Sequence, residues 1–260
     1  MLDLRGTTSR INVHQHANAS PQRAGNVDLA AVQHRHPGPT HLTRGQRRKA
    51  RVKIGRDGKE YRGDVVVIAA HLEPTLREIA RLANEPSGPA LLLDVASVKV
   101  PVAGAAKALS NFVATHPMAG SERSGPSAAR PDLFEGCSWA YVPTGDRELD
   151  ARACRFIESL GGIPVAMTAE EHDRLVALTS HLPQVLALCY ARMLRAAGEN
   201  AEQLCGPVAR ELLRISGMSA AMWGDILQAN AHNIEPELRR LSRELDAAAD
   251  ALAHSGRADG

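Results

Sequence analysis

Three short polar motifs follow apolar runs in the middle of this 260-residue chain. They are Asp-Val-Ala-Ser-Val-Lys at 94–99, His-Pro-Met-Ala-Gly at 116–120 and Ser-His-Leu-Pro at 180–183. Neutral imidazole accepts protons well near pH 7, so His116 is a candidate general base. Ligands of open α/β sheets bind outside the carboxyl ends of the strands, where Ser97 and His116 are expected. The motifs therefore predict a reaction centre at a sheet edge.

Each of these residues also has a simpler interpretation. Ser97 precedes a predicted helix and could be its N-cap, because Ser is a favoured capping residue. His116 could be a core histidine. Ser180 and His181 could form a hydrogen-bonded pair within an apolar helix, since buried polar groups are costly unless they are satisfied. The residue types alone leave both interpretations open.

The elements that must position these motifs alternate between strand and helix. Short β-branched runs without polar alternation are typical of parallel strands covered on both faces. Strands are expected at 64–70, 90–94, 111–115, 138–142 and 163–166, with helices at 74–82, 102–109 and 148–160 between them. The last of these helices should stop at Gly161 and Gly162. This alternation predicts a doubly wound, Rossmann-like parallel sheet.

After residue 166 the pattern becomes helical throughout. Thr168 and Glu171 fit a capping box, in which each side chain satisfies the other's backbone N–H. A long helix should start there and run towards Leu194, bending just after His181 because Pro183 removes a backbone hydrogen bond. The apolar faces of this helical part are broad enough to bury a partner subunit, which predicts a homodimer.

Charge divides the chain into unlike parts. Residues 1–62 hold thirteen Lys/Arg against four Asp/Glu, and the remainder holds eighteen against twenty-five. The first part contains a basic run at 44–53 and two His-x-His pairs, at 14–16 and 34–36, with little apolar periodicity, so we expect a poorly ordered segment rather than a nucleic-acid or metal site. The four cysteines are far apart, and no long apolar run indicates a membrane or secretion. A cytoplasmic protein is expected.

The three motifs, in this order and spacing, resemble the signature of the prephenate dehydrogenase family. The resemblance covers about residues 64–245 and implies oxidative decarboxylation of prephenate, or of arogenate, in tyrosine biosynthesis. It implies that His116 is the base, that Ser97 orients the substrate hydroxyl and that Ser180 and His181 line the substrate pocket. The same resemblance assigns Arg214 as the carboxylate clamp and places Gln184 where the family varies, whereas from its type and position alone Arg214 could be a surface residue of a helix. Arg210, one helical turn before Arg214 and on the same side, is a candidate second cation.

The family uses NAD or NADP, and the resemblance implies that the strand ends line this cofactor through Ala70, Asp94, Ala96 and Ser97. Family members open with a strand and a Gly-x-Gly-x-x-Gly turn that holds the pyrophosphate. No such turn precedes residue 64. Cofactor binding is therefore in doubt, and we expect an incomplete sheet with an uncovered edge.

The sequence thus predicts an α/β region followed by an all-α region. Residues 1–62 form the atypical basic segment, 63–166 the nucleotide-binding domain and 167–255 the helical substrate and dimerisation domain. Prephenate is favoured over arogenate because Gln184 is neutral and offers no carboxylate to an amino group. The main alternative is a catalytically impaired family member that acts as a ligand-binding or structural dimer. A nucleic-acid binder using the basic segment is the weaker alternative.

Overall fold

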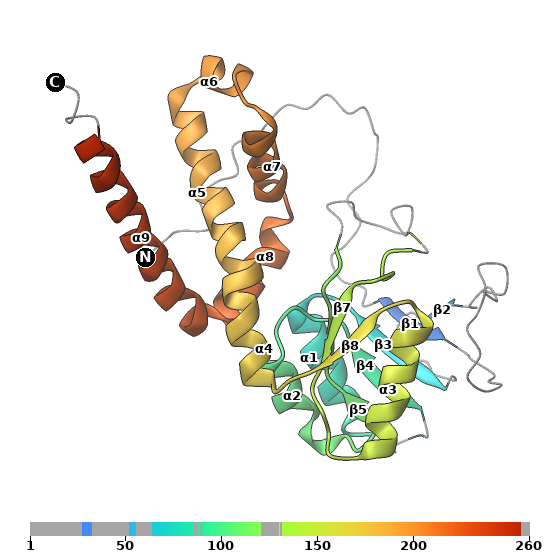
Figure 1. The fold of residues 1–260 in the computed structure, drawn as a ribbon. Helices are drawn as coiled ribbons and strands as arrows, with labels where there is room; N and C mark the ends of the chain where they lie inside the picture. Colours follow the sequence, from blue (N-terminus) through green and yellow to red (C-terminus); the bar gives the residue numbers. More distant parts are fainter. Residues whose placement is uncertain are drawn as a thin grey trace, which may run out of the picture.

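The computed structural model of the protein describes residues 64–85, 88, 90–120, 130 and 132–255, together with the backbone of 28–32 and 52–55. The His-x-His pairs and most of the basic run lie outside these residues. Two sheets with helices packed on them form one part of the molecule, and a set of long helices projects from it (Figure 1).

The main sheet has five strands in the order β2-β1-β3-β4-β5. Its centre is β3 (Val65–Ala69), β4 (Leu91–Asp94) and β5 (Phe112–Val113), which run parallel as predicted. On the other side of β3 lies β1 (Asp28–Val32), which is antiparallel to β3 and to β2 (Val52–Gly55). The expectation of an uncovered sheet edge beside β3 is therefore wrong, because β1 pairs along the whole of that strand.

Helices cover both faces of the central strands, as their apolar sequences require. On one face Val66, Ile68 and Leu92 pack with Ile79 of α1 (Leu72–Leu82) and Val102 of α2 (Val100–Ala105). A short 3-10 turn, η1 (Ala106–Ala108), continues α2. On the other face, Val67, Leu93 and Val113 of the sheet pack against α3 (Arg147–Ser159). A doubly covered sheet buries both sets of alternate side chains, which explains the continuous apolar runs.

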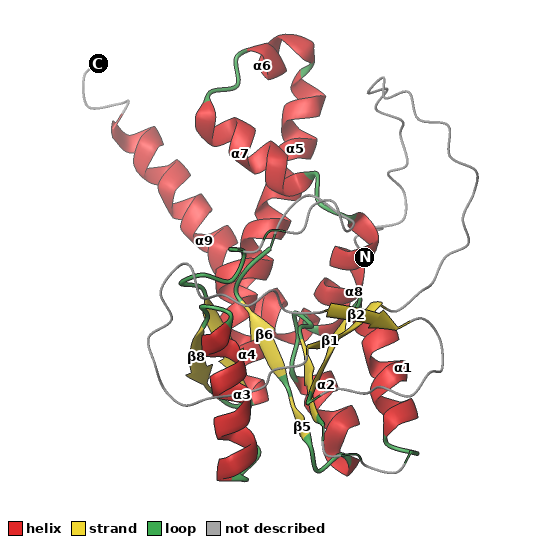
Figure 2. Ribbon diagram, turned by 90° about the vertical axis from the view of Figure 1, so that its right-hand side faces the viewer, coloured by secondary structure: helices red, strands yellow, loops and turns green. Residues whose placement is uncertain are grey.

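A second, three-stranded sheet begins where the sequence predicted the end of the third strand. β5 ends at Val113, and after Ala114 the chain continues as β6 (Thr115–Pro117), which follows nearly in line with β5 (Figure 2). β6 is antiparallel to β7 (Ser138–Tyr141), and β7 is parallel to β8 (Ile163–Ala166). One continuous strand over 111–115, leading to a loop at His116, is thus a wrong expectation. His116 lies within β6, opposite Ala140.

The predicted stop of α3 is confirmed. The helix ends at Ser159, and Gly161 adopts a φ of +85°, which side-chain-bearing residues rarely adopt. Gly162 lies so close to the Ile157 side chain that an added Cβ would approach it to 2.9 Å. The two glycines therefore turn the chain from α3 into β8.

The predicted long helix starts at Thr168, whose hydroxyl accepts the Glu171 N–H at 3.1 Å. The reciprocal half of the capping box is absent among the described contacts, so that half of the prediction is wrong. α4 (Ala169–Val176) passes through a π-helical turn, η3 (Ala177–His181), into α5 (Leu182–Ala197). The irregularity therefore lies in the turn that ends at His181, whereas the bend was expected just after His181. The wider π-helical turn accommodates the missing N–H of Pro183, which follows it.

The remaining helices complete two projecting arms. α5 with α6 and α7 forms one arm, and most of α9 forms the other (Figure 1). Large apolar side chains remain exposed on both, including Met193, Val208, Leu245 and Leu252. No helix in the described part of the chain is both long and apolar enough to cross a membrane. The bounds of these helices are α6 (Glu199–Gln203), α7 (Pro207–Ser216), α8 (Ala220–Ala229) and α9 (Ala231–Ser255).

Candidate active site

A buried ion pair lies at the carboxyl ends of β4 and β5. Lys99 and Asp94 are both fully buried and in direct contact, and Lys99 Nζ also donates to the Thr115 carbonyl at 2.6 Å. Asp94 accepts the backbone N–H of Ala96 at 2.9 Å and that of Thr115 at 2.8 Å. Burial lowers the pKa of Lys99, and the Asp94 charge opposes that shift.

This ion pair explains why the chain changes sheets at Ala114. The Asp94 side chain takes the Thr115 N–H, and the Thr115 hydroxyl donates to the Asp94 carbonyl, so side chains replace the strand ladder beyond β5. β6 is then free to pair with β7. The Asp94 carboxylate is already bonded to Lys99 and to the backbone N–H groups of Ala96 and Thr115. At the predicted cofactor site it therefore stabilises the ends of the strands.

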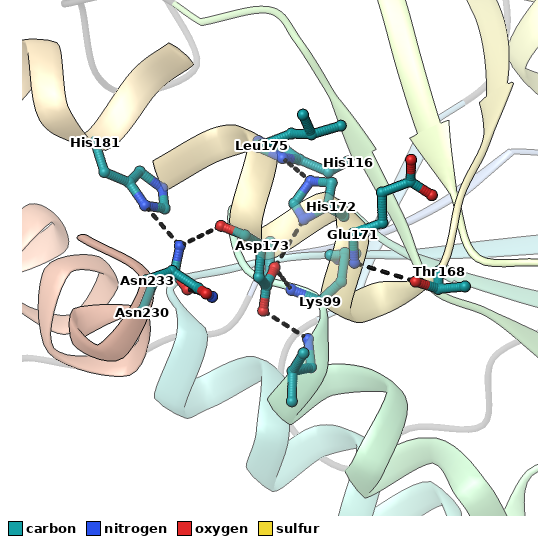
Figure 3. Close-up of polar contacts among 12 residues, drawn as sticks. Lys99, His116, Thr168, Glu171, His172, Asp173, Leu175, His181, Asn230 and Asn233 are labelled. Carbon is teal, nitrogen blue, oxygen red and sulfur yellow. Dashed lines mark hydrogen bonds and ion pairs between the residues drawn. The ribbon is translucent and has the colours of Figure 1, made fainter. Parts of the chain in front are cut away.

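His116 is positioned by a second buried pair. Its Nδ1 lies 2.9 Å from Nε2 of His172, and Nδ1 of His172 lies 2.7 Å from Oδ1 of Asp173 (Figure 3). Asp173 also accepts the backbone N–H groups of Lys99 at 2.6 Å and of Val100 at 2.9 Å. We call the following set the strand-end cluster: Asp94, Lys99, Thr115, His116, His172 and Asp173.

The cluster keeps the His116 ring neutral near pH 7. Burial lowers its pKa well below the ordinary value, and the nearby Lys99 charge, His172 and His181 lower it further. An imidazole that stays unprotonated at neutral pH can accept a proton. The geometry therefore supports the predicted role of His116, although the residue lies within a strand.

Ser97 lies in the loop between β4 and α2, half-buried, and its hydroxyl has no hydrogen-bond partner among the described residues. It is not the N-cap of α2: that position belongs to Lys99, and the Asp173 carboxylate accepts the first N–H groups of the helix. The capping interpretation is therefore wrong. Its hydroxyl remains available beside the buried Ala96, in the loop that follows β4, while Ala70 directly follows β3.

His181 lies at the end of the π-helical turn and is fully buried. Its Nδ1 is 3.1 Å from Nδ2 of Asn230, and its ring meets that of Trp223 edge-on with the ring centres 5.9 Å apart, while its Nε2 has no hydrogen-bond partner among the residues that the structure describes. Burial lowers the pKa of His181 to about 4, against a smaller opposing effect of the Asp173 charge. The preceding Ser180 is half-buried without a partner in the described chain, so the two do not form the self-satisfied pair that was the simpler interpretation.

Gln184, the third residue of α5, is buried and donates from Nε2 to the Ile215 carbonyl at 3.2 Å. This bond ties α5 to α7 next to Arg214. Oε1 of Gln184 has no hydrogen-bond partner in the described part of the chain. Buried polar atoms without partners are uncommon in folded proteins, and they often lie where a ligand or a water molecule binds. Nε2 of His181 and Oε1 of Gln184 are two such atoms on one helix.

Arg210 and Arg214, which we call the arginine pair, lie on α7 and are both exposed. Arg214 forms an ion pair with Glu211 at 2.6 Å, and Arg210 donates from Nε to the Cys205 carbonyl at 3.0 Å. No contact within the described chain joins either arginine to His116 or Ser97. The structure therefore does not bring the predicted carboxylate clamp to the predicted base.

Sequence reasoning missed His172, Asp173 and the linking role of Asn230. Asn230 Nδ2 donates to the Asp173 carbonyl at 2.6 Å and lies 3.1 Å from Nδ1 of His181. A signal was present in the sequence, since the adjacent His172 and Asp173 fall on the face of α4 that also buries Ala169 and Val176. Two polar residues on a buried helix face must find partners.

Comparison with known proteins gives two matches along this chain. Residues 37–165 match the prephenate dehydrogenase nucleotide-binding domain, and residues 168–259 match the prephenate dehydrogenase dimerisation domain. The first match begins well before residue 64, so the similarity to the family extends further towards the N-terminus than the motifs indicated.

Individual relatives agree. A probable prephenate dehydrogenase of Streptomyces niveus is 40% identical over 65% of this chain and 48% of its own length. The prephenate dehydrogenase of Bacillus subtilis is 34% identical over 70% of this chain and 52% of its own. The chain thus spans about half the length of these curated relatives.

Solved structures show the same fold. Prephenate dehydrogenase of Aquifex aeolicus, in complex with hydroxyphenyl propionate and NAD+, superposes with a TM-score of 0.68 at 24% identity, over 76% of this chain and 71% of that one. Synechocystis arogenate dehydrogenase gives a TM-score of 0.63 at 25% identity, over 76% and 74%. With its matching domains, its relatives and its fold in agreement, this chain belongs to the prephenate dehydrogenase family.

Proposed function

We propose that this protein carries out the oxidative decarboxylation of prephenate to 4-hydroxyphenylpyruvate in tyrosine biosynthesis, with a nicotinamide dinucleotide as the hydride acceptor. The observation that carries the proposal is the placement of His116, a neutral imidazole fixed by His172 at a sheet edge. The Ser97 hydroxyl, in the loop after β4, has no hydrogen-bond partner among the described residues. The family membership agrees with this chemistry.

His116 would take the proton of the ring hydroxyl as the hydride leaves the same carbon. Ser97 would hold that hydroxyl in line with His116, and His181 would offer its unpartnered Nε2 to the substrate or the cofactor. General-base catalysis of this kind contributes about 10²–10⁴-fold to a rate. Loss of carbon dioxide and aromatisation of the ring then make the reaction irreversible.

The cofactor fits the described residues only in part. The nicotinamide end would lie along Ala70, Ala96 and Ser97, where the strands end. Among the described residues the pyrophosphate end has no comparable cradle, because β1 runs antiparallel to β3 and its carboxyl end, at Val32, lies opposite Val65, the first residue of β3. The residue that would distinguish NAD from NADP belongs to the N-terminal part outside the described residues.

The substrate carboxylates need cations, and the arginine pair supplies them. A guanidinium group binds a carboxylate through two parallel hydrogen bonds. Arg214 now makes such contacts with Glu211, so a substrate carboxylate would replace that partner. Gln184 is a neutral amide that already donates to Ile215, so the ammonium group of arogenate would find no carboxylate there, and prephenate is the better fit.

We propose a homodimer, which the exposed apolar side chains of the two arms and the match to a dimerisation domain support. Monomers rarely expose large contiguous apolar surfaces. The second subunit would cover α5, α7 and α9. We further propose a cytoplasmic location, in keeping with a biosynthetic role.

The test is an absorbance assay for reduced nicotinamide, with prephenate and arogenate each offered with NAD and with NADP at millimolar concentration. Activity with prephenate, and its loss in His116→Asn, is the expected result. A protein that binds prephenate but reduces neither cofactor would contradict the proposal.

The antiparallel β1 favours one alternative, a ligand-binding or structural dimer that retains the substrate pocket without catalysis. Losing the pyrophosphate cradle removes several charge-assisted hydrogen bonds, each about 1.5–3 kcal/mol. Calorimetric titration with both dinucleotides decides between the two. Micromolar binding supports the enzyme, and no binding at millimolar concentration supports the alternative.

A further inference from the structure

We propose that Asp173 and His172 act as positioning residues that fix the tautomer of His116, leaving its Nε2 unprotonated and able to accept the substrate proton. This inference rests on the proposed function of His116 as the base. It concerns three side chains in a row, Asp173, His172 and His116, which Figure 3 shows linked by two dashed contacts.

The chain of contacts has a fixed direction. The carboxylate of Asp173 can only accept, so Nδ1 of His172, at 2.7 Å, must carry a hydrogen. In a neutral His172 ring, Nε2 then holds a lone pair that faces Nδ1 of His116 at 2.9 Å. Two ring nitrogens at this distance need one hydrogen between them, and His116 must supply it. With the proton on Nδ1, Nε2 of a neutral His116 is the basic atom.

The direction would reverse if His172 were doubly protonated. Its Nε2 would then donate to Nδ1 of His116, and the neutral His116 would carry its hydrogen on Nε2, where no base would remain. A doubly protonated His172 would add a second positive charge to the cluster that already holds Lys99. Lys99 is fully buried nearby, and its positive charge already lowers the pKa of His116. Asp173 divides its negative charge between His172 and two backbone N–H groups of α2.

Asp173 is itself held rigidly, which an orienting group requires. Its carboxylate spans the first N–H groups of α2, whose helix dipole favours a negative charge at this end. Its backbone carbonyl accepts Nδ2 of Asn230 at 2.6 Å. His172 and Asp173 are each only 1% exposed. The pair therefore transmits its orientation to His116 with little freedom to rotate.

A purely structural role is the competing explanation, since Asp173 also joins α4 to α2. The two explanations differ in what they require of His116. A structural role needs the two helices to stay together and makes no demand on which ring nitrogen carries the proton. The tautomer is therefore the readout that separates them.

The experiment is a long-range ¹H–¹⁵N spectrum of the histidine rings of the full-length protein at pH 7.5, without ligands. His116→Gln identifies the His116 signals, and His71→Gln, at an exposed position, is the matched control. The expected result is a hydrogen on Nδ1 and a free Nε2 in His116. A hydrogen on Nε2 of His116 in the parent protein would overturn the proposal, and this outcome needs no variant at the cluster.

Two substitutions then test the link. His172→Leu removes the acceptor, so His116 should lose its Nδ1–H preference, and kcat should fall about 10²-fold. His172→Gln can present an amide oxygen to Nδ1 of His116, so this variant should restore most of the Nδ1–H preference and most of kcat. If His172→Leu left the tautomer unchanged, the proposal would fail. A parent protein with the expected tautomer and no dehydrogenase activity would instead overturn the proposed function alone.

Discussion

At the strand-end cluster the charged side chains of Asp94, Lys99 and Asp173 are buried and each bonded to two or more protein groups, whereas the arginine pair lies exposed on α7. Both regions are needed by the proposed reaction. Contacts within the protein fix the position of the proposed base in the strand-end cluster before any substrate binds. The substrate-binding end has an arginine paired with Glu211, a neighbour one turn away, so it must exchange partners when a substrate binds. The difference teaches that the base is preorganised and the clamp is not.

Breaking the buried ion pair should have the largest effect. Lys99→Met leaves Asp94 as a buried charge without its partner, which should lower the free energy of unfolding by about 3–5 kcal/mol. That is a large share of the about 5–15 kcal/mol typical of a domain. Urea unfolding followed by circular dichroism measures it, with the exposed Lys107→Met as the control. A loss below about 1 kcal/mol would show that the pair does not hold the sheet edge.

Removing the base tests the same cluster for chemistry. His116→Asn should lower kcat by about 10²–10⁴-fold, because no neutral imidazole remains to accept the hydroxyl proton. The unfolding midpoint is measured beside the rate, so that loss of folding is recognised. A variant as active as the parent would remove His116 from the mechanism.

The stability of the cluster should depend on pH through its histidines. The pKa of His181 is lowered by burial to about 4 in the folded protein, from about 6.5 in the unfolded chain. The unfolded state therefore binds more protons between these values, so stability rises with pH across that window and is complete above pH 6.5. His181 contributes about 3 kcal/mol of this rise, and His116 acts in the same direction.

Urea unfolding at intervals from pH 4 to 7.5 measures this dependence. His181→Gln should flatten the curve, since an amide does not titrate in this range. If the parent protein were equally stable at pH 4.5 and 6.5, burial would not lower the pKa of His181 and His116 as stated here.

The clamp should respond more weakly. Arg214→Lys keeps the charge but loses the two-pronged contact. One lost hydrogen bond to a charged group corresponds to about 1.5–3 kcal/mol, so KM for prephenate should rise about ten- to hundredfold with little change in kcat. Arg239→Lys, in a similar exposed pair with Glu235 on α9, is the matched control. An unchanged KM would exclude Arg214 from substrate binding.

The smallest effect is expected at the partner of that arginine. Glu211→Gln should leave Tm unchanged, because exposed ion pairs contribute little to stability. KM should stay the same or fall, since Arg214 no longer has to leave a carboxylate. A rise in KM would mean that Glu211 orients Arg214 for the substrate rather than competing for it.

The sequence by itself determined the central β3, β4 and β5, the start of the long helix at Thr168, and His116 and Ser97 as candidates for chemistry. Apolar runs, a capping hydroxyl and short motifs are local signals, and local signals can be recognised in the sequence without knowing the tertiary structure. Four features depended on tertiary contacts, the first two of them at the ends of β5 and α2. The switch from β5 to β6 follows from the Asp94 side chain reaching Thr115, 21 residues away in sequence. The start of α2 is satisfied by Asp173, 74 residues beyond Lys99, instead of by Ser97.

The support of His116 also required the tertiary structure, because His172 lies 56 residues further along the chain. A buried polar group must find a partner, and this rule would have required partners for His172 and Asp173 once their burial was recognised. The rule does not say which groups the partners are. Partner choice was decided by which elements the packed sheet and helices bring together, and the antiparallel direction of β1 beside β3 was decided in the same way.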